Sequence, residues 1–159
     1  MTLKAAVTRE LAGWPTFQDG ERTLVVQDGA QSATCRLVAL DNIGCAFLSL
    51  AVHGDVSSSP RELADLKGAA ERLADRLNYL LEPVSPIEVD SEGCTVQMRS
   101  SPPQKDDDGT SYYELLITRA GELSLSRYQR SAGAERRQVP AHVTREVLLR
   151  LVHDFAAAL

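Results

Sequence analysis

The stretch that decides the fold reads ATCRLVALDNIGCAFLSLAV and covers residues 33–52. Two runs, 33–40 and 45–52, are almost entirely apolar, and Asp41-Asn42-Ile43-Gly44 separates them. These four residues suit a type I turn followed by a left-handed glycine, a common three-residue hairpin connection. The sequence therefore predicts a β-hairpin. Its continuous apolar strands predict that both faces of this part of the sheet are covered.

A second turn of the same kind indicates that the chain repeats one unit. Thr118-Arg119-Ala120-Gly121 resembles the first turn, and Gly121 follows Gly44 by 77 positions. We expect each hairpin to lead to a helix with proline at its first position, Pro60 in the first half and Pro140 in the second. The predicted unit is a β-meander followed by a helix, over about 20–82 and again over 86–159.

The repeat also predicts which side chains share a buried face. A 77-position shift preserves the pleat, so residues of the first hairpin should correspond to residues of the second. The expected pairs are Val38 and Leu40 with Leu115 and Ile117, and Ala46 and Leu48 with Leu123 and Leu125.

Helical periodicity completes the predicted architecture. An apolar stripe from Leu3 to Trp14 predicts a first helix, and a strand is expected at Thr23–Val26. Ser59-Pro60-Arg61-Glu62 has the pattern of a capping box, and Pro83 ends the helix that it opens. The sequence thus predicts a single α+β domain over 1–159, an antiparallel sheet with helices in the order α-βββ-α-ββββ-α.

The second helix carries a leucine stripe that allows two interpretations. Leucines 63, 66, 73 and 77 follow helical spacing, which suits a coiled-coil seam between two chains. The same spacing suits one helix packed on its own sheet. The sequence leaves both open.

The second half contains an insertion of about residues 100–112, which predicts a solvated loop outside the sheet. Asp106-Asp107-Asp108-Gly109 resembles part of a calcium loop, but an EF-hand alignment would place Leu115 at the bidentate acidic position. The EF-hand is therefore excluded, and a simpler cation site at Asp106–Asp108 stays as an alternative to a solvated acidic turn.

Composition limits the classes of partner. The chain has 159 residues, a formal net charge of -5 and 5% aromatic residues, so it lacks the long-range field and the stacking platforms that favour nucleic acid. Its longest apolar-rich run, 45–52, is too short to span a bilayer. We expect no membrane partner and a cytoplasmic location. The three cysteines match no zinc or redox spacing, which predicts buried, reduced thiols.

The element order, the size and the acidity resemble those of the type III secretion chaperones (Tir chaperone-like proteins). The resemblance covers almost the whole chain and involves no diagnostic motif. It implies a cytosolic homodimer without enzymatic activity that binds extended segments of partner proteins. Carried over to this sequence, it implies a dimer helix at Leu63, Leu66, Leu73 and Leu77 and a binding sheet that includes Val38, Leu48 and Leu50.

The sequence offers no catalytic constellation. It contains no nucleophile elbow and no glycine-rich phosphate loop, and its histidines lack metal-ligand spacing, so we expect no cofactor and no metal. The predicted function is a non-enzymatic protein-binding module, a chaperone or adaptor. A small-molecule or metal sensor is the first alternative, with Asp106–Asp108 or Arg127, Tyr128 and Arg130 as polar anchors. An enzyme is the second.

Overall fold

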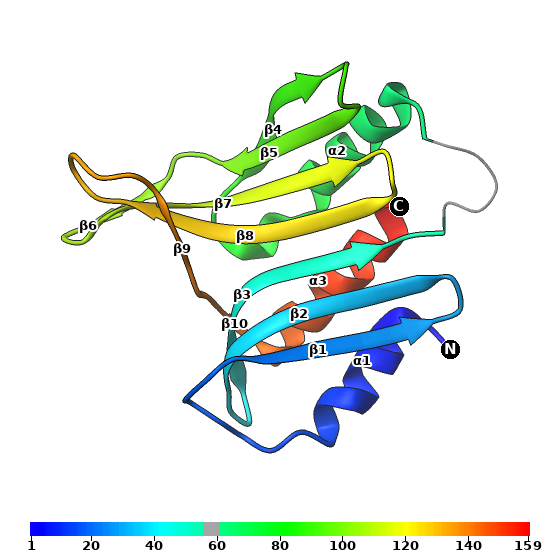
Figure 1. Cartoon of the computed structure of the whole chain (residues 1–159), viewed down its shortest axis with the longest axis vertical. Coiled ribbons are helices and arrows are strands. Elements are labelled where there is room, and N and C mark those ends of the chain that lie inside the picture. The colour runs from blue at the N-terminus through cyan, green and yellow to red at the C-terminus, as the bar shows by residue number, and fades with distance from the viewer. Residues whose placement is uncertain (56–60) are drawn as a thin grey trace.

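A computed structural model describes residues 1–55 and 61–159 as one ten-stranded antiparallel sheet with helices on one face (Figure 1). The predicted α+β class is confirmed. The helices are α1 (Leu3–Ala12), α2 (Leu63–Arg76), the short 3-10 helix η1 (Asn78–Leu80) and α3 (Arg145–Ala158). The strands are β1 (Arg22–Asp28), β2 (Gln31–Leu40), β3 (Gly44–His53), β4 (Val84–Asp90), β5 (Thr95–Ser100), β6 (Gln104–Asp106), β7 (Gly109–Thr118), β8 (Glu122–Arg130), β9 (Arg137–Val139) and β10 (Ala141–Thr144).

The strand order is β1-β2-β3-β8-β7-β5-β4, with all pairs antiparallel. Two meanders, β1-β2-β3 and β5-β7-β8, meet along β3 and β8. Two similar units related by a twofold axis through the sheet would give this order. The hairpin predicted over 113–130 is confirmed, and its side chains Leu115, Ile117, Leu123 and Leu125 are all buried.

The correspondence between the two hairpins fails at Val38 and Leu48. The β2–β3 register shifts twice, because Arg36 pairs with Ser49, Leu37 with Phe47 and Ala39 with Ala46. Val38 and Leu48 therefore have no direct cross-strand partner, and both stay partly exposed. A 77-position shift does not reproduce such irregularities, so the buried faces correspond only in part.

The two predicted turns also differ in their backbone. Gly121 is left-handed with φ +81°, as expected, but Gly44 is not among the residues with positive φ. The Asp41 carboxylate organises the first turn instead, since its Oδ1 accepts hydrogen bonds from the amides of Ile43 at 2.8 Å and Gly44 at 2.6 Å. A side-chain cap of this kind replaces the left-handed glycine.

Neither helix start agrees with the proline rule. At α2 the N-cap is Glu62, which forms a capping box with Asp65; Ser59 and Pro60 lie outside the described residues. Pro140 precedes β10, whose four residues pair with Gly44–Phe47 of β3. α3 begins only at Arg145, and the Thr144 hydroxyl caps it by accepting a hydrogen bond from the Val147 amide at 3.0 Å.

Strands β3 and β8 pair along only part of their length and then separate, and we call the point of separation the fork. β3 pairs with β8 over Ser49–His53 and with β10 over Gly44–Phe47. Beyond the fork, β8 pairs with β9, and the β6–β7 hairpin extends away from the helices (Figure 1). The insertion predicted as a loop is therefore partly a hairpin, whose turn Asp106 closes by accepting hydrogen bonds from the amides of Asp108 and Gly109.

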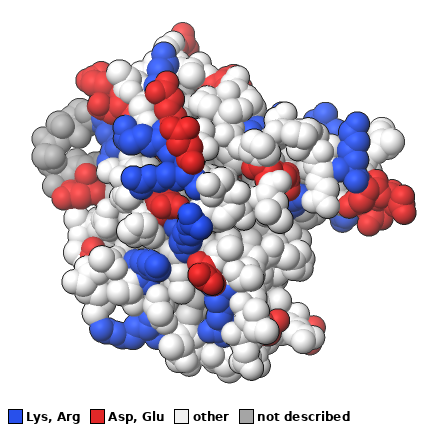
Figure 2. Space-filling model, turned by 180° about the vertical axis from the view of Figure 1, so that it is seen from behind, with Lys and Arg blue, Asp and Glu red and all other residues white. Residues whose placement is uncertain are grey.

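The leucine stripe of α2 faces the protein's own sheet. Leu66, Leu73 and Leu77 are at most 1% exposed and Leu63 packs at the edge of the same core, so the dimer-seam interpretation is wrong and packing on the sheet is confirmed. The outward residues of α2 include Lys67, Glu71, Arg72 and Asp75. Figure 2, viewed from the helix side, shows charged side chains of both signs over this face.

No helix in the described part of the chain is both long and apolar enough to cross a bilayer.

Candidate binding site

On the face of the sheet opposite the helices, which we call the open face, no helix or strand of residues 1–55 and 61–159 forms a second layer (Figure 1). The prediction that β2 and β3 are covered on both faces is therefore wrong. At the centre of the open face, Ser49 and Ala51 of β3 pair with Ser126 and Ser124 of β8, and all four are half-buried. Their short side chains leave a low floor between β2 and β7.

The predicted binding sheet is only partly on this surface. Val38 and Leu48 are partly exposed, at the irregular part of the β2–β3 pair. Leu50 is fully buried in the core, because the pleat turns it away from its neighbours Ser49 and Ala51. Leu50 is therefore excluded as a binding residue.

A hollow of about 700 Å³ lies where the open face reaches β5, β7 and β8. Its lining includes Arg99, Tyr112, Arg130 and Arg136, and we call it the arginine hollow. Arg99 pairs with Glu114 across the strands and Glu114 pairs with Ser126, so these side chains form one row on the open face. The hollow is thus continuous with the floor of the sheet.

The hollow carries an excess of positive charge. The Glu114 carboxylate accepts a hydrogen bond from Arg99 at 3.3 Å and one from Arg136 at 2.5 Å, so two guanidinium groups share one carboxylate. The bond to Glu114, with a second to the Tyr112 hydroxyl, raises the pKa of Arg136. Arg130 makes no ion pair with any described residue. In the part of the chain that the structure describes, Glu88 is the one acidic residue that lines the hollow, and together with Glu114 it gives two carboxylates against three guanidinium groups.

Two of the guanidinium groups are held against aromatic rings. Arg99 lies 4.6 Å from the centroid of Tyr112, and Arg136 lies 4.0 Å from the centroid of Tyr128. The two rings are 6.1 Å apart. Stacking fixes the plane of a guanidinium group, so less side-chain entropy is lost when it binds a carboxylate.

Arg99 also has a buried Nε atom without a hydrogen-bond partner. A donor of this kind costs about 1–3 kcal/mol of desolvation. Native proteins contain few unsatisfied buried groups, and each requires a reason. The Arg99 side chain as a whole is 39% exposed, so it stays accessible to a ligand in the hollow.

The anchors predicted for a sensor are separated by the fold. Arg130 lines the arginine hollow and Tyr128 lies beneath Arg136, but Arg127 faces the helix side, where it pairs with Glu82. Asp106–Asp108 form the tip of the β6–β7 hairpin. Among the described residues no three His, Cys, Asp or Glu side chains are grouped to hold a metal ion.

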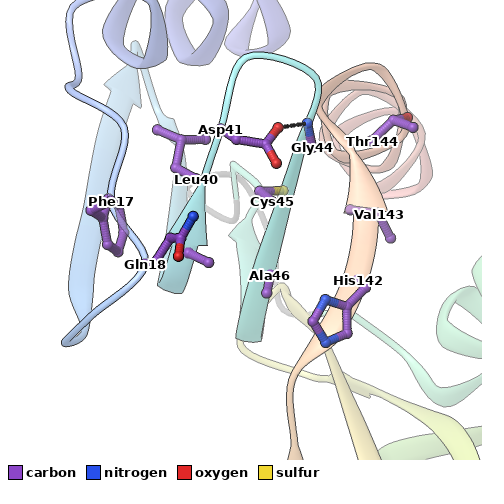
Figure 3. Close-up of a pocket in the computed structure, with 11 residues that line it drawn as sticks. Phe17, Gln18, Leu40, Asp41, Gly44, Cys45, Ala46, His142, Val143 and Thr144 are labelled. Atoms are coloured by element: carbon purple, nitrogen blue, oxygen red, sulfur yellow. Dashed lines mark hydrogen bonds between the residues drawn. The ribbon is translucent and has the colours of Figure 1, made fainter.

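A smaller hollow of about 370 Å³ lies beside the β2–β3 turn, between Phe17 and β10 (Figure 3). It brings together Asp41, Cys45 and His142, residue types that occur in catalytic sites. Burial raises the pKa of the Cys45 thiol to about 11, which keeps it protonated at neutral pH. The Asp41 carboxylate is bonded to the Gly44 amide (Figure 3). This hollow therefore lacks an activated nucleophile.

The thiols provide a simple test of this assignment. Burial also raises the pKa of Cys35, whereas Cys94 is only half-buried. A raised pKa leaves Cys45 almost entirely in the unreactive thiol form near neutral pH. We expect iodoacetamide to modify Cys94 first, and Cys35 and Cys45 only in urea, as measured by peptide mass spectrometry. Rapid labelling of native Cys45 would contradict the assignment.

The residues of the arginine hollow come from separate parts of the chain, and the sequence pointed to Arg130 as a polar anchor but not to Arg99 or Tyr112. Arg99, Tyr112 and Arg136 lie in β5, in β7 and in the connection before β9. Comparison with protein-family models, with curated proteins and with solved structures finds no match to this chain.

Proposed function

We propose that this protein is a non-enzymatic protein-binding module, a cytoplasmic chaperone or adaptor, that holds an extended acidic segment of a partner against its open face. The observation that carries the proposal is the arginine hollow, because it presents three guanidinium groups at one end of the open face of the sheet. A carboxylate of the partner would occupy the hollow, where Arg130 has no ion-pair partner among the residues that the structure describes.

The floor of the open face suits an extended chain. Ser49 and Ser124 supply hydroxyl groups that can donate to or accept from a peptide main chain, and Ser126, whose oxygen accepts a hydrogen bond from Gln138 at 3.2 Å, can still donate. The neighbouring residues Val38 and Leu116 supply partly exposed apolar contacts on either side. A segment lying across these strands would therefore find polar and apolar contacts together, and its acidic side chain would fix its position.

A small anionic molecule is the second candidate ligand for the same hollow. The observation that favours it is the volume of about 700 Å³, which lies in the range of about 300–1,000 Å³ that small-molecule sites occupy. A di- or tricarboxylate would meet the same three guanidinium groups.

The test is the affinity of an extended, glutamate-containing peptide, measured by fluorescence anisotropy. Arg130→Gln should weaken binding by roughly 10- to 100-fold, because a hydrogen bond to a charged group contributes about 1.5–3 kcal/mol. Arg137→Gln is the matched control, since Arg137 on β9 donates a hydrogen bond to Gln129 on β8 and does not line the hollow.

Two further arms decide between the candidates. The same peptide with glutamine in place of glutamate should bind weakly if the hollow selects a carboxylate. Citrate that binds and depends on Arg130, without peptide binding, would establish the small-molecule candidate. If neither ligand binds, or if Arg130→Gln and Arg137→Gln behave alike, both candidates are wrong.

A further inference from the structure

The two edges of the sheet differ in how they meet solvent. β4, at one edge, contains Pro86, and its register with β5 shifts between Pro86 and Glu88. Proline and a bulge are devices that prevent an edge strand from pairing with another chain. β1, at the other edge, has seven residues in unbroken register with β2 and contains neither proline nor glycine. Its second edge is unpaired within the described chain.

The sequence of β1 is complementary to itself. It reads Arg-Thr-Leu-Val-Val-Gln-Asp from Arg22 to Asp28. If two copies pair antiparallel about Val25, Arg22 of each lies opposite Asp28 of the other. The same register places Thr23 opposite Gln27 and Leu24 opposite Val26. Opposite charges and β-branched pairs stabilise antiparallel strands, and a parallel arrangement would place like charges side by side.

We propose that β1 pairs with β1 of a second copy of this chain, antiparallel and centred on Val25, to form a twofold homodimer with one continuous sheet. Val25 is 66% exposed in the single chain, and its counterpart in the second copy would cover it. Leu24 and Val26 are buried on the helix face, so pairing would join the two cores. Pairing of this kind stops at two copies, because the free edge of each β1 is then occupied by the other β1.

The proposal is independent of the arginine hollow. β1 is at the opposite end of the strand order from β5 and β4, so two hollows would lie on the outer parts of the dimer sheet. The charge of Arg22 is already held in place by stacking at 4.8 Å over Phe17. Neither Arg22 nor Asp28 is part of the buried core, so both can be replaced without unfolding the chain.

A charge swap followed by sedimentation velocity tests the register. Arg22→Asp and Asp28→Arg should each weaken the dimer by roughly tenfold or more, since each creates two repulsive pairs across the twofold axis. An equimolar mixture of the two variants should form a heterodimer, because Asp at position 22 of one then faces Arg at position 28 of the other. The chain with both substitutions should dimerise again.

Glu88→Arg on β4 is the control, with a charge change at the other edge strand, and it should leave the dimer unchanged. Circular dichroism verifies that each variant is folded. The proposal is overturned if the native chain is monomeric at the highest concentration studied, if the single variants dimerise normally, or if the mixture fails to restore the dimer. A dimer that only Glu88→Arg disrupts would place the contact on β4 instead.

Discussion

Leu73→Asp is expected to unfold the protein rather than to release a folded monomer. Leu73 is fully buried between α2 and the sheet, in a core made of apolar side chains. An aspartate at this position would therefore be surrounded by apolar groups. Loss of a buried leucine alone costs about 2–5 kcal/mol. Burial of an unpaired carboxylate adds several more. The sum approaches the 5–15 kcal/mol by which a typical domain of this kind is stable.

Circular dichroism and sedimentation of the same samples distinguish the outcomes. Arg72→Asp is the matched control, because Arg72 is the neighbouring residue on the exposed side of α2, and its melting temperature should change little. Leu73→Ala should give an intermediate loss of stability. A folded, monomeric Leu73→Asp protein would instead show that the leucine stripe contacts a second chain.

The elements of the fold could be predicted from local pattern, but their exact starts could not. The apolar runs of β2 and β3 predicted the first hairpin, and the second turn with its 77-position shift predicted the strands β7 and β8, because period and burial are linked in a sheet. Pro140 misled the prediction of α3. Its interpretation as a helix start ignored β10, whose four residues pair only because β3 and β8 separate. Nothing local in the sequence indicates that fork.

The leucine stripe shows a different limit. A leucine stripe at helical spacing indicates that one face of α2 is buried, but it does not indicate which element covers that face. The covering sheet, to which β4, β5 and β7 contribute, comes from residues after the helix. The charged outward residues were visible in the sequence, and they argue for packing within the chain, since a helix in a dimer seam would need a second apolar face.

The candidate site was the least predictable part. Arg130 was predicted as a polar anchor together with Arg127, but Arg127 lies on the opposite face, because side chains alternate along a strand and residues three apart point to opposite sides. Arg99 and Tyr112 are adjacent only through the β5–β7 register. The alternating burial of β5 and β7 excludes a slip by one residue, which would turn their buried side chains outward. It does not exclude a slip by two residues, which keeps the faces but would place different side chains in the hollow.

The Glu82–Arg127 ion pair gives the second large effect expected from substitution. Its atoms are 3.0 Å apart, and the two side chains are only 13% and 11% exposed. Arg127 also lies 4.4 Å from the centroid of Tyr113 and donates to Gln104 at 3.2 Å. Glu82 accepts a further hydrogen bond from the Ser100 hydroxyl at 3.0 Å. The pair thus joins the segment after η1 to β5, β6 and β8.

Glu82→Ala should destabilise the protein by about 3–5 kcal/mol, because it leaves the Arg127 charge buried without a partner. Glu82→Leu with Arg127→Leu should recover much of that loss, since neither charge then remains. Urea unfolding measures both. Arg36→Ala is the control: Arg36 and Glu21 form an exposed pair, with side chains 43% and 40% exposed, whose loss should cost less than about 1 kcal/mol.

Comparison with Arg36→Ala and with the double replacement decides what causes the loss of stability in Glu82→Ala. If Glu82→Ala costs no more than Arg36→Ala, water reaches Arg127 and the pair does not hold the segment after η1 to the sheet. If the double replacement is as unstable as Glu82→Ala, the loss comes from the Ser100 hydrogen bond, through which the Tyr113 amide is also held at 2.7 Å. In the expected case, β8 keeps its position through Arg127 on the helix face while Arg130 stays available on the open face.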